Sequence, residues 1–240
     1  MKNARLSLLI ICAILMGCEA DRGRKKNIVD DYNAILERAH KADQQEHRYV
    51  QLYKSSHDSQ TWLGGKPSMP ANMDWPVGDG DAYRFLAQIN CAELPLDLWD
   101  GAGPRRGWLL IFGGYKNGRM DYKILHSEEL GIERNPPMIP QNFYGEGAFI
   151  SQKVPVMIKV NSSTRRTFQN EDGVLAIIGG RPDKFHPGIE IADPLNALIF
   201  EAISNQELGW QWQSGILTIT VPMKDLQNGK YEPIIFDMGG

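Results

Sequence analysis

Side chains with reactive chemistry are few in this chain, and they are widely spaced. The histidines and cysteines are His40, His47, His57, His126, His186, Cys12, Cys18 and Cys91. His40 and His47 fall seven residues apart, whereas two histidines that share a metal on one helix are usually four apart. We therefore interpret both as surface residues, and the sequence predicts neither a metal site nor a cofactor.

The sequence motifs of catalysis are also missing. It contains no Gly-x-Ser-x-Gly elbow, no His-Glu-x-x-His, no phosphate-binding Gly-Lys-Ser/Thr loop and no paired cysteine ligands. Asp79-Gly80-Asp81 resembles part of a calcium loop, but its glycine is misplaced for an EF-hand and no downstream Glu completes it. We interpret this segment as a turn and predict no catalytic residues. An active site assembled from distant carboxylates stays open as an alternative.

Cys18 has a defined chemistry because of the residues before it. A basic segment with Lys2 and Arg5 precedes the uncharged residues 6–16, which are too few to span a bilayer and are typical of a secretory signal. The segment Leu15-Met16-Gly17-Cys18 then resembles the bacterial lipobox, which implies acylation of Cys18 and cleavage after Gly17. We predict a lipoprotein signal peptide at residues 1–17, and a lipidated Cys18 with a basic linker at 18–27.

Acylation would fix the location of the chain. Two or more acyl chains, palmitate among them, hold a protein on a membrane almost permanently. Glu19 stands where an Asp would resemble the signal for inner-membrane retention, which favours the periplasmic face of the outer membrane in a diderm host. The alternative is an ordinary signal peptide that happens to contain a cysteine.

Charge and cysteine content restrict the function further. The 240 residues carry a net charge of −3, and removal of Lys2 and Arg5 with the signal makes it −5. An acidic body argues against sequence-independent nucleic-acid binding. Cys91 would be the only free thiol after acylation, so the core alone must stabilise the fold without a disulfide. We expect Cys91 to be a small buried apolar residue, with a nucleophile as the alternative.

The hydrophobic pattern predicts an α+β fold with mostly antiparallel sheets. Apolar residues recur near the helical period over 28–54, which predicts one amphipathic N-terminal helix. Short apolar runs bounded by turn residues then predict strands at 84–90, 107–113, 121–126, 153–160, 197–204, 215–221 and 231–236. Pro155 suggests that its strand lies at a sheet edge. Residues 127–148 are expected to form a long irregular connection.

Three blocks of sequence recur in the same order. Gly64-Gly65-Lys66-Pro67 returns as Gly179-Gly180-Arg181-Pro182, and the runs 86–94 and 107–111 return as 200–208 and 215–219. Repeats of this kind predict an internal duplication of two related β-rich halves, at about 55–150 and 151–240. Chance similarity is the alternative.

The repeated blocks also resemble a known family. The run Trp62-Leu63-Gly64-Gly65-Lys66-Pro67, the pair Trp75-Pro76 and the strand Phe85-Leu86-Ala87-Gln88-Ile89 resemble the YwqG-like family, a domain of unknown function. The second half resembles it more weakly, because Gln213-Ser214 replaces the Gly-Asp that follows a Trp in the family. The resemblance covers about residues 60–240. It implies duplicated α+β halves and no established reaction.

The resemblance and the loop tryptophans define the candidate binding residues. Tryptophan is enriched at binding hot spots, although core packing is the alternative for each one. The candidates are Gly64, Gly65, Pro67, Trp75, Pro76, Gln88, Trp99, Trp210 and Trp212.

Two functions follow from these observations. The favoured one is a membrane-anchored envelope lipoprotein that binds a protein partner without catalysis, for example an immunity protein against a delivered toxin. Its partners would be the bilayer, through Cys18, and an unidentified protein, with no nucleic acid. The alternative is an envelope hydrolase or carbohydrate-modifying enzyme with an acid–base carboxylate pair.

Overall fold

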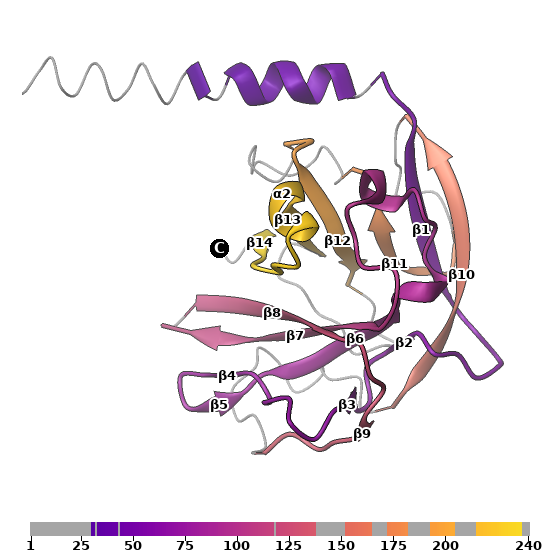
Figure 1. Ribbon diagram of the computed structural model, residues 1–240, viewed down its shortest axis with the longest axis vertical. Coiled ribbons are helices and arrows are strands. Elements are labelled where there is room, and N and C mark those ends of the chain that lie inside the picture. Colours follow the sequence, from indigo (N-terminus) through magenta and orange to yellow (C-terminus); the bar gives the residue numbers. More distant parts are fainter. Residues whose placement is uncertain are drawn as a thin grey trace, which may run out of the picture.

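Antiparallel strands make up most of the fold (Figure 1). The computed structural model describes residues 30–31, 33–42, 44–117, 119–137, 152–164, 172–181, 193–204 and 215–236. The long strands are β1 (His47–Lys54), β6 (Arg84–Asn90), β7 (Trp108–Lys116), β8 (Arg119–Ser127), β10 (Val154–Ser163), β11 (Val174–Gly179), β12 (Asn196–Ile203) and β13 (Ile216–Pro222). The short ones are β2 (Trp62–Leu63), β3 (Ser68–Met69), β4 (Val77–Gly78), β5 (Asp81–Ala82), β9 (Ile132–Glu133) and β14 (Ile234–Phe236).

The helices are short and lie outside the sheet. Two 3-10 turns, η1 (Cys91–Glu93) and η2 (Leu98–Gly101), follow β6, and α2 (Met223–Gln227) follows β13. Residues 30–31 and 33–42 are helical and are called the N-terminal helix below. None of the helices in the described ranges is long and apolar enough to cross a membrane.

One ten-stranded antiparallel sheet has a mirrored strand order. From the central pair β1 and β10, one side continues as β11, β12, β13 and β14, and the other as β2, β6, β7 and β8. We call β2-β6-β7-β8 the first half of the sheet and β11-β12-β13-β14 the second half. Each half follows the chain order outward from the centre.

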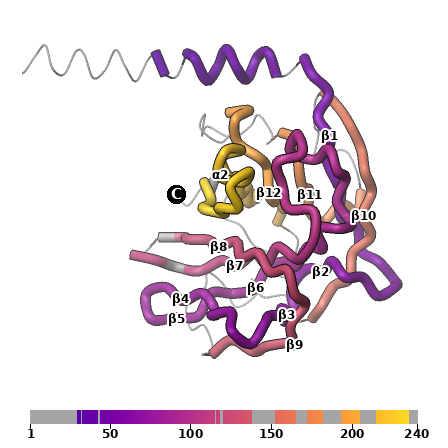
Figure 2. Tube along the Cα trace, in the orientation of Figure 1, coloured from indigo at the N-terminus to yellow at the C-terminus, as the bar shows by residue number. Residues whose placement is uncertain are grey.

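Each of the two central strands pairs with the half that it does not directly precede in the chain. β1 precedes the first half in the chain but pairs with β11 of the second half, and β10 precedes the second half but pairs with β2 of the first. β1 and β10 also pair with each other over their full length, from His47 opposite Ser163 to Lys54 opposite Val156. Figure 2 shows the indigo β1 running beside the salmon β10. The halves are therefore interlocked.

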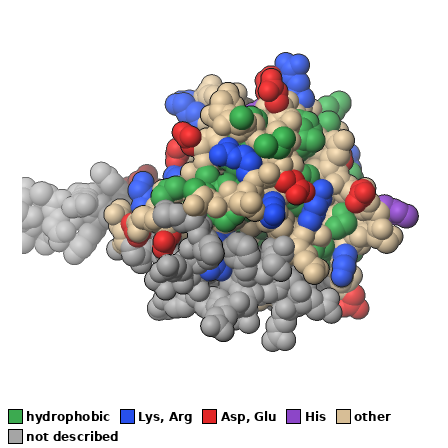
Figure 3. Space-filling model, turned by 90° about the horizontal axis from the view of Figure 1, so that it is seen from below, with side chains coloured by type: hydrophobic (Ala, Val, Ile, Leu, Met, Phe, Trp, Pro, Cys, Tyr) green, Lys and Arg blue, Asp and Glu red, His purple; other side chains and the backbone are tan. Residues whose placement is uncertain are grey.

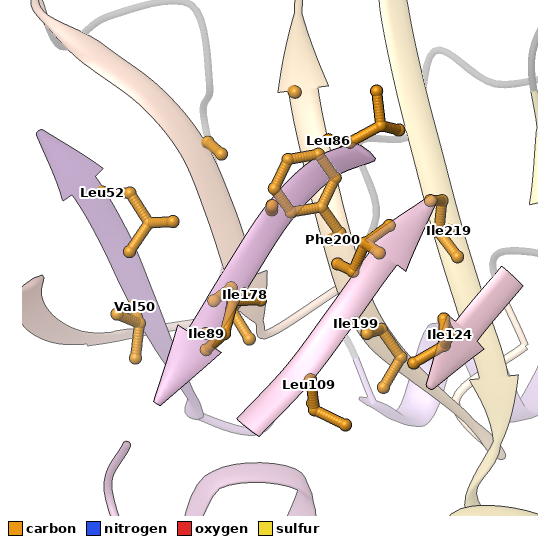
Figure 4. Close-up of a cluster of buried hydrophobic side chains, with 14 of the residues drawn as sticks. Val50, Leu52, Leu86, Ile89, Leu109, Ile124, Ile178, Ile199, Phe200 and Ile219 are labelled. Atoms are coloured by element: carbon orange, nitrogen blue, oxygen red, sulfur yellow. The ribbon is translucent and has the colours of Figure 1, made fainter. Parts of the chain in front are cut away.

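A single large core joins the halves. Buried residues of the first half, such as Ile89 and Leu109, belong to the same cluster as Ile199 and Phe200 of the second (Figure 4). The far ends of the sheet also approach each other, since the His126 and Tyr231 rings lie 5.6 Å apart. The sheet thus curls around one hydrophobic interior, which stabilises the fold without a disulfide.

The predicted helix over 28–54 is wrong in its second half. Residues 47–54 form β1, in which the consecutive side chains of Val50, Gln51 and Leu52 are all buried. Val50 and Leu52 point into the main core, and Gln51 between them is buried on the opposite face of the strand, so both faces are covered at the middle of β1. The spacing of Tyr49 and Leu52 fits a helical face only by coincidence. Pairing of this segment with β10 and β11 determines that it forms a strand.

The other element predictions have mixed outcomes. The seven strands predicted between 84 and 236 are present, shifted by at most a few residues at their ends. The prediction that Pro155 marks an edge strand is wrong, because β10 lies between β1 and β2. Pro155 is the second residue of β10, opposite Trp62 at the end of the ladder. Part of the irregular connection predicted at 127–148 lies outside the described residues.

Candidate functional site

A hollow of about 200 Å³ lies beside the N-terminal helix. We call it the helix-side pocket. Its walls come from the start of β1, the η2 turn, the residues after β11, the residues before β12 and the start of α2. They are Glu46, His47, Arg48, Asp97, Trp99, Asp100, Gly180, Arg181, Asp193, Pro194, Asn196, Ala197 and Met223. β1, β11 and β12 are neighbours in the sheet, and their adjacency brings most of these segments together. The pocket therefore depends on the pairing of β1 with β11.

The η2 turn forms one wall of the helix-side pocket, and two of its residues have an unusual backbone conformation. Trp99 and Asp100 have φ angles of 53° and 51°, in the left-handed region that non-glycine residues seldom adopt. Two contacts hold the turn: the Trp99 indole donates to the Leu198 carbonyl over 2.8 Å, and Arg105 donates to the Gly101 carbonyl over 2.8 Å. Strained backbone of this kind is concentrated at functional sites.

Trp99 is a support for this wall and is not a free binding surface. Its side chain is 6% exposed, and it packs so closely on Gly103 that a β-carbon there would lie 2.2 Å from the ring. The tryptophan therefore positions Asp97 and Asp100 on either side of it. Of the seven candidate binding residues that lie in the described ranges, Trp99 alone lines the helix-side pocket.

Two of the carboxylates on the pocket wall form ion pairs with arginines. Arg48 Nε lies 3.1 Å from Asp97 Oδ2, and Arg38 of the N-terminal helix lies 2.7 Å from Asp193 Oδ2. The hydrogen bond to Asp193 raises the pKa of Arg38, so this guanidinium stays charged. Arg181 donates to the Ala39 carbonyl over 2.8 Å. The helix is therefore attached to the pocket by polar contacts.

Two carboxylates remain available on the pocket wall. Glu46 and Asp100 are exposed and make no ion pair with any residue in the described ranges. The pocket thus offers both acidic and basic groups to a ligand. Within those ranges, no three His, Cys, Asp or Glu side chains are grouped closely enough to hold a metal ion.

Three exposed leucines lie near pocket residues in the sequence. Leu36, Leu96 and Leu195 are 45%, 76% and 57% exposed. Leu96 precedes Asp97 and Leu195 lies between Pro194 and Asn196, all of which line the pocket. Leu36 belongs to the helical turn that carries Arg38. These leucines therefore come from three separate segments of the chain.

The other family-motif residues lie elsewhere, on the outer face of the first half. They attach the segment 66–83 to the sheet. Gln88 is fully buried, and its side-chain oxygen accepts from the Ser68 backbone over 2.9 Å. The Trp75 indole donates to the Tyr83 carbonyl over 2.7 Å, and its ring lies edge-on to Phe112 at 5.3 Å.

The remaining motif residues act through the backbone. Gly64 and Gly65 have φ angles of 62° and 69°, and a β-carbon on Gly65 would lie 2.8 Å from the Lys153 nitrogen. The carbonyls of Pro67 and Pro76 accept from Arg134 and Tyr83. These motif residues are thus structural. Cys18, Trp210 and Trp212 lie outside the described residues.

Cys91 has the buried role expected from the sequence. Its side chain is 2% exposed, and burial raises the pKa of the thiol to about 12. A thiol with such a pKa is not a thiolate at neutral pH, and the thiolate is the nucleophilic form. The alternative of a cysteine nucleophile is therefore disfavoured.

The residues of the pocket were not found from the sequence. Arg48, Asp97, Arg181 and Asp193 come from segments far apart in the chain, and only the sheet topology brings them together. The one local signal was Trp99 between two aspartates in a turn.

A family comparison supports the resemblance over part of the chain. Residues 61–138 match the family described as a domain of unknown function, DUF1963. This match agrees with the YwqG-like motifs and covers the first half of the sheet with β3, β4, β5 and β9. No curated protein matches the chain.

Proposed function

We propose that this protein is a membrane-anchored envelope lipoprotein that binds a protein partner without catalysis. The lipobox at Leu15-Met16-Gly17-Cys18 supports the anchor, and in a diderm host Glu19 favours the periplasmic face of the outer membrane. Cells grown with a palmitate analogue should label the wild-type chain but not Cys18→Ala. Equal labelling of both would contradict the anchor.

The observation that carries the binding role is an exposed apolar surface at the end of the molecule opposite the N-terminal helix. Leu130 and Ile132, at β9, are 49% and 72% exposed there, and we call them the remote-end surface. Figure 3 views this end and shows hydrophobic side chains between charged ones. Exposed apolar groups rimmed by charge are typical of protein-binding sites.

The remote-end surface is held rigidly. Gly131 lies between Leu130 and Ile132 and packs directly on the backbone of Met69, where a β-carbon would lie 1.9 Å from the carbonyl carbon. β9 pairs with β3, and Arg134 donates to the Met73 carbonyl over 2.6 Å. A preorganised surface binds with a smaller loss of entropy. It also lies at the end of the molecule away from the N-terminal helix (Figure 1), where a partner has free access.

The test is capture of the partner from the native envelope. Ile132→Glu and Leu130→Glu should abolish recovery of a partner that the wild-type protein retains. Met157→Glu is the matched control, because Met157 is 57% exposed on β10 and outside this surface. Loss of capture by the control alone, or by none of the three variants, would contradict the assignment.

An immunity protein is the concrete form that we propose to test. Its partner would be a toxin delivered by neighbouring cells, which a periplasmic binding protein could neutralise. Deletion should then sensitise cells to toxin-bearing neighbours, and Ile132→Glu should do the same. Wild-type resistance after deletion, together with no toxin in the capture experiment, would exclude this form.

We also propose that the two halves arose by internal duplication, with exchange of their first strands. The mirrored strand order supports it, and so do the left-handed φ angles of both Gly64-Gly65 and Gly179-Gly180. The strand bounds would place the units at about 47–127 and 154–236. A chain in which the second unit precedes the first should fold, and failure would argue against equivalence.

An enzyme remains the second candidate because four carboxylates line the helix-side pocket. Two of them are held by arginines, which leaves Glu46 and Asp100 as the acid–base pair of a hydrolase. Glu46→Gln and Asp100→Asn should then each abolish hydrolysis of envelope polysaccharide. Absence of hydrolysis by the wild-type protein would exclude this candidate.

A further inference from the structure

We infer that the protein forms a dimer in which β10 of one copy pairs antiparallel with β10 of a second copy. The contact is the edge of β10 that faces away from β1, from Ile158 to Ser162, and we call it the open edge. This inference concerns neither the helix-side pocket nor the remote-end surface, and it does not depend on the proposed function.

The open edge exists because β2 is short. β10 pairs with β1 from Val156 to Ser163, but on its other side β2 pairs only with Val154 and Pro155. The Thr61 carbonyl extends that side by one residue, because it accepts from the Val156 N–H over 3.2 Å. Among the described residues, no strand pairs with this side of β10 beyond that point. Figure 1 shows β10 outside β1 on this side of the molecule.

The hydrogen bonds at the start of β10 show which backbone groups face the open edge. The N–H of Val156 points to Thr61, away from β1. The carbonyl of Pro155 points the other way and accepts from Ser55, directly after β1. Successive residues of a strand direct their backbone groups to opposite edges, and the ladder between β1 and β10 has no register shift. The residues that direct both N–H and C=O to the open edge are therefore Ile158, Val160 and Ser162.

Side chains beside the open edge are exposed on both faces of the strand. Val160 is 45% exposed, although Val50 opposite it on β1 is fully buried. Met157, on the other face, is 57% exposed. Unpaired backbone groups flanked by exposed apolar side chains favour pairing with another strand.

The single charge on this stretch lies toward β1. Lys159 is the only charged residue from Val156 to Ser163. Its ammonium lies 5.8 Å from the centre of the Tyr53 ring, and Tyr53 belongs to β1. A lysine can protect a strand edge from pairing when it is directed outward. This one is directed to the opposite side, so it leaves the open edge accessible.

The open edge is complementary to itself in one register. A two-fold dimer brings the same patch of both copies together. With the axis at Val160, this residue faces its own copy, and Ile158 faces Ser162 of the second copy. Facing residues of this kind exchange two hydrogen bonds, so every outward backbone group from Ile158 to Ser162 finds a partner. Lys159 then faces Asn161 of the second copy, and no like charges are opposed.

The neighbouring registers are worse. An axis at Lys159 would place two lysines directly opposite each other, which is destabilising, and would need the Val156 N–H that Thr61 already accepts. An axis at Asn161 would place Ile158 opposite residue 164, beyond the end of β10. The fit to the single register at Val160 is what favours a second copy of this chain over a strand of another protein.

Sedimentation velocity tests the dimer. The chain of residues 18–240 with Cys18→Ser, which carries no acyl group, is measured from about 1 µM to about 1 mM, a range that covers moderate and weak association. A contact through one strand edge is small, so we expect a reversible monomer–dimer equilibrium within this range. A monomer at every concentration would overturn the inference.

Variants of the axial residue locate the contact. Val160→Lys places two like charges directly opposite each other and should weaken the dimer at least about 10-fold. Val160→Thr is the matched control, because it keeps the branched side chain, and it should change the dissociation constant by less than about 3-fold. Circular dichroism checks that both variants are folded. A dimer that persists unchanged in Val160→Lys would use another surface and would contradict the inference.

Cysteines report the register. Cα atoms of facing hydrogen-bonded residues lie about 5.5 Å apart, within the range of about 4.4–6.8 Å that a disulfide spans. Val160→Cys in the Cys18→Ser chain should therefore form a disulfide between copies on mild oxidation. Ser162→Cys is equally on the open edge but lies about 14 Å along the strand from its own copy, so it should not. Cross-linking of Ser162→Cys alone, or of both equally, would overturn the register.

The outcomes also separate a second copy from another partner. If the chain is monomeric throughout and Val160→Lys abolishes capture of an envelope protein, the open edge binds a strand of that protein and the inference is wrong. If Val160→Lys abolishes the dimer but leaves capture through the remote-end surface intact, the dimer is supported and is independent of the proposed function.

Discussion

The two halves of the sheet have similar strand pairing but differ in the side chains that pack on their outer faces. Cys91 and Ser204 occupy the same place at the ends of β6 and β12, where each donates its backbone N–H to the glycine before the next strand, Gly107 or Gly215. Both inner faces contribute to one core. The outer faces carry a large aromatic cluster in the first half and a smaller described cluster around Ile177 in the second.

The difference shows where the family signal lies. The motif residues Gly64, Gly65, Trp75 and Gln88 hold the cover of the first half in place, and the family match ends at residue 138. In the structure, Gln88 corresponds to the buried Glu201, one residue before the position that the sequence repeat predicts, and Glu201 accepts from Thr218 over 3.0 Å. The family motifs therefore lie where the segment 66–83 packs on the outer face of the first half. The helix-side pocket, in contrast, is lined largely by residues of the second half.

Truncation of the shared core should have the largest effect on both halves. Phe200→Ala removes a fully buried ring from the joint cluster and should lower the free energy of unfolding by about 3–5 kcal/mol. Urea denaturation followed by tryptophan fluorescence and by circular dichroism should give one coincident transition. Two separate transitions would show that the halves fold independently and that the interlocking is weak.

The paired glycines should distinguish the halves by what lies next to them. A methyl group on Gly65 meets the Lys153 backbone at 2.8 Å, whereas on Gly180 it meets the Tyr49 side chain at 3.0 Å. We expect losses of unfolding free energy of about 2–4 kcal/mol for Gly65→Ala and about 1–2 kcal/mol for Gly180→Ala.

Gly229→Ala is the control for these two variants. Its φ angle is 67° but no atom lies within 4 Å of the added carbon, so only the backbone cost of about 1 kcal/mol remains. Equal losses for all three variants would show that the close approach to Lys153 has no energetic effect.

Two tryptophans of the first-half cover should respond differently to loss of the indole N–H. Trp75→Phe breaks the 2.7 Å bond to the Tyr83 carbonyl and should cost about 1–2 kcal/mol of unfolding free energy. The buried indole nitrogen of Trp62 has no hydrogen-bond partner among the residues that the structure describes, so Trp62→Phe should cost less than about 1 kcal/mol. Thermal denaturation of the two variants measures the difference, and the reverse order would contradict it.

The smallest expected effect is the reactivity of Cys91. Because burial raises the pKa of its thiol to about 12, the thiolate form is scarce at pH 8 and rises only as the pH approaches 12. A chain of residues 18–240 with Cys18→Ser carries Cys91 as its single thiol. When folded it should resist iodoacetamide, and when unfolded in urea it should react at the rate of a free thiol. Mass spectrometry follows the reaction. Rapid alkylation of the folded chain would contradict the burial of Cys91.

Much of the sheet could be predicted from the sequence, because its strands are short apolar runs between turn residues. β6 has the predicted bounds, from Arg84 to Asn90. β1 was not predicted because it begins at His47, soon after a helix that ends at residue 42. The hydrophobic pattern of the sequence shows no boundary between these two elements. The helix-side pocket was missed because ion pairs such as Arg48 with Asp97 join residues far apart in the chain.

The central position of β1 has a mechanical consequence for a chain held at its N-terminus. Tension applied at the N-terminus would first load the polar contacts of the N-terminal helix. It would then reach His47, the first residue of a strand that is paired on both edges. β1 would have to slide along β10 and β11, breaking many hydrogen bonds together instead of one after another. Such shear loading resists force better than peeling of an edge strand, so the exchange would protect the body when its membrane or partner pulls on it.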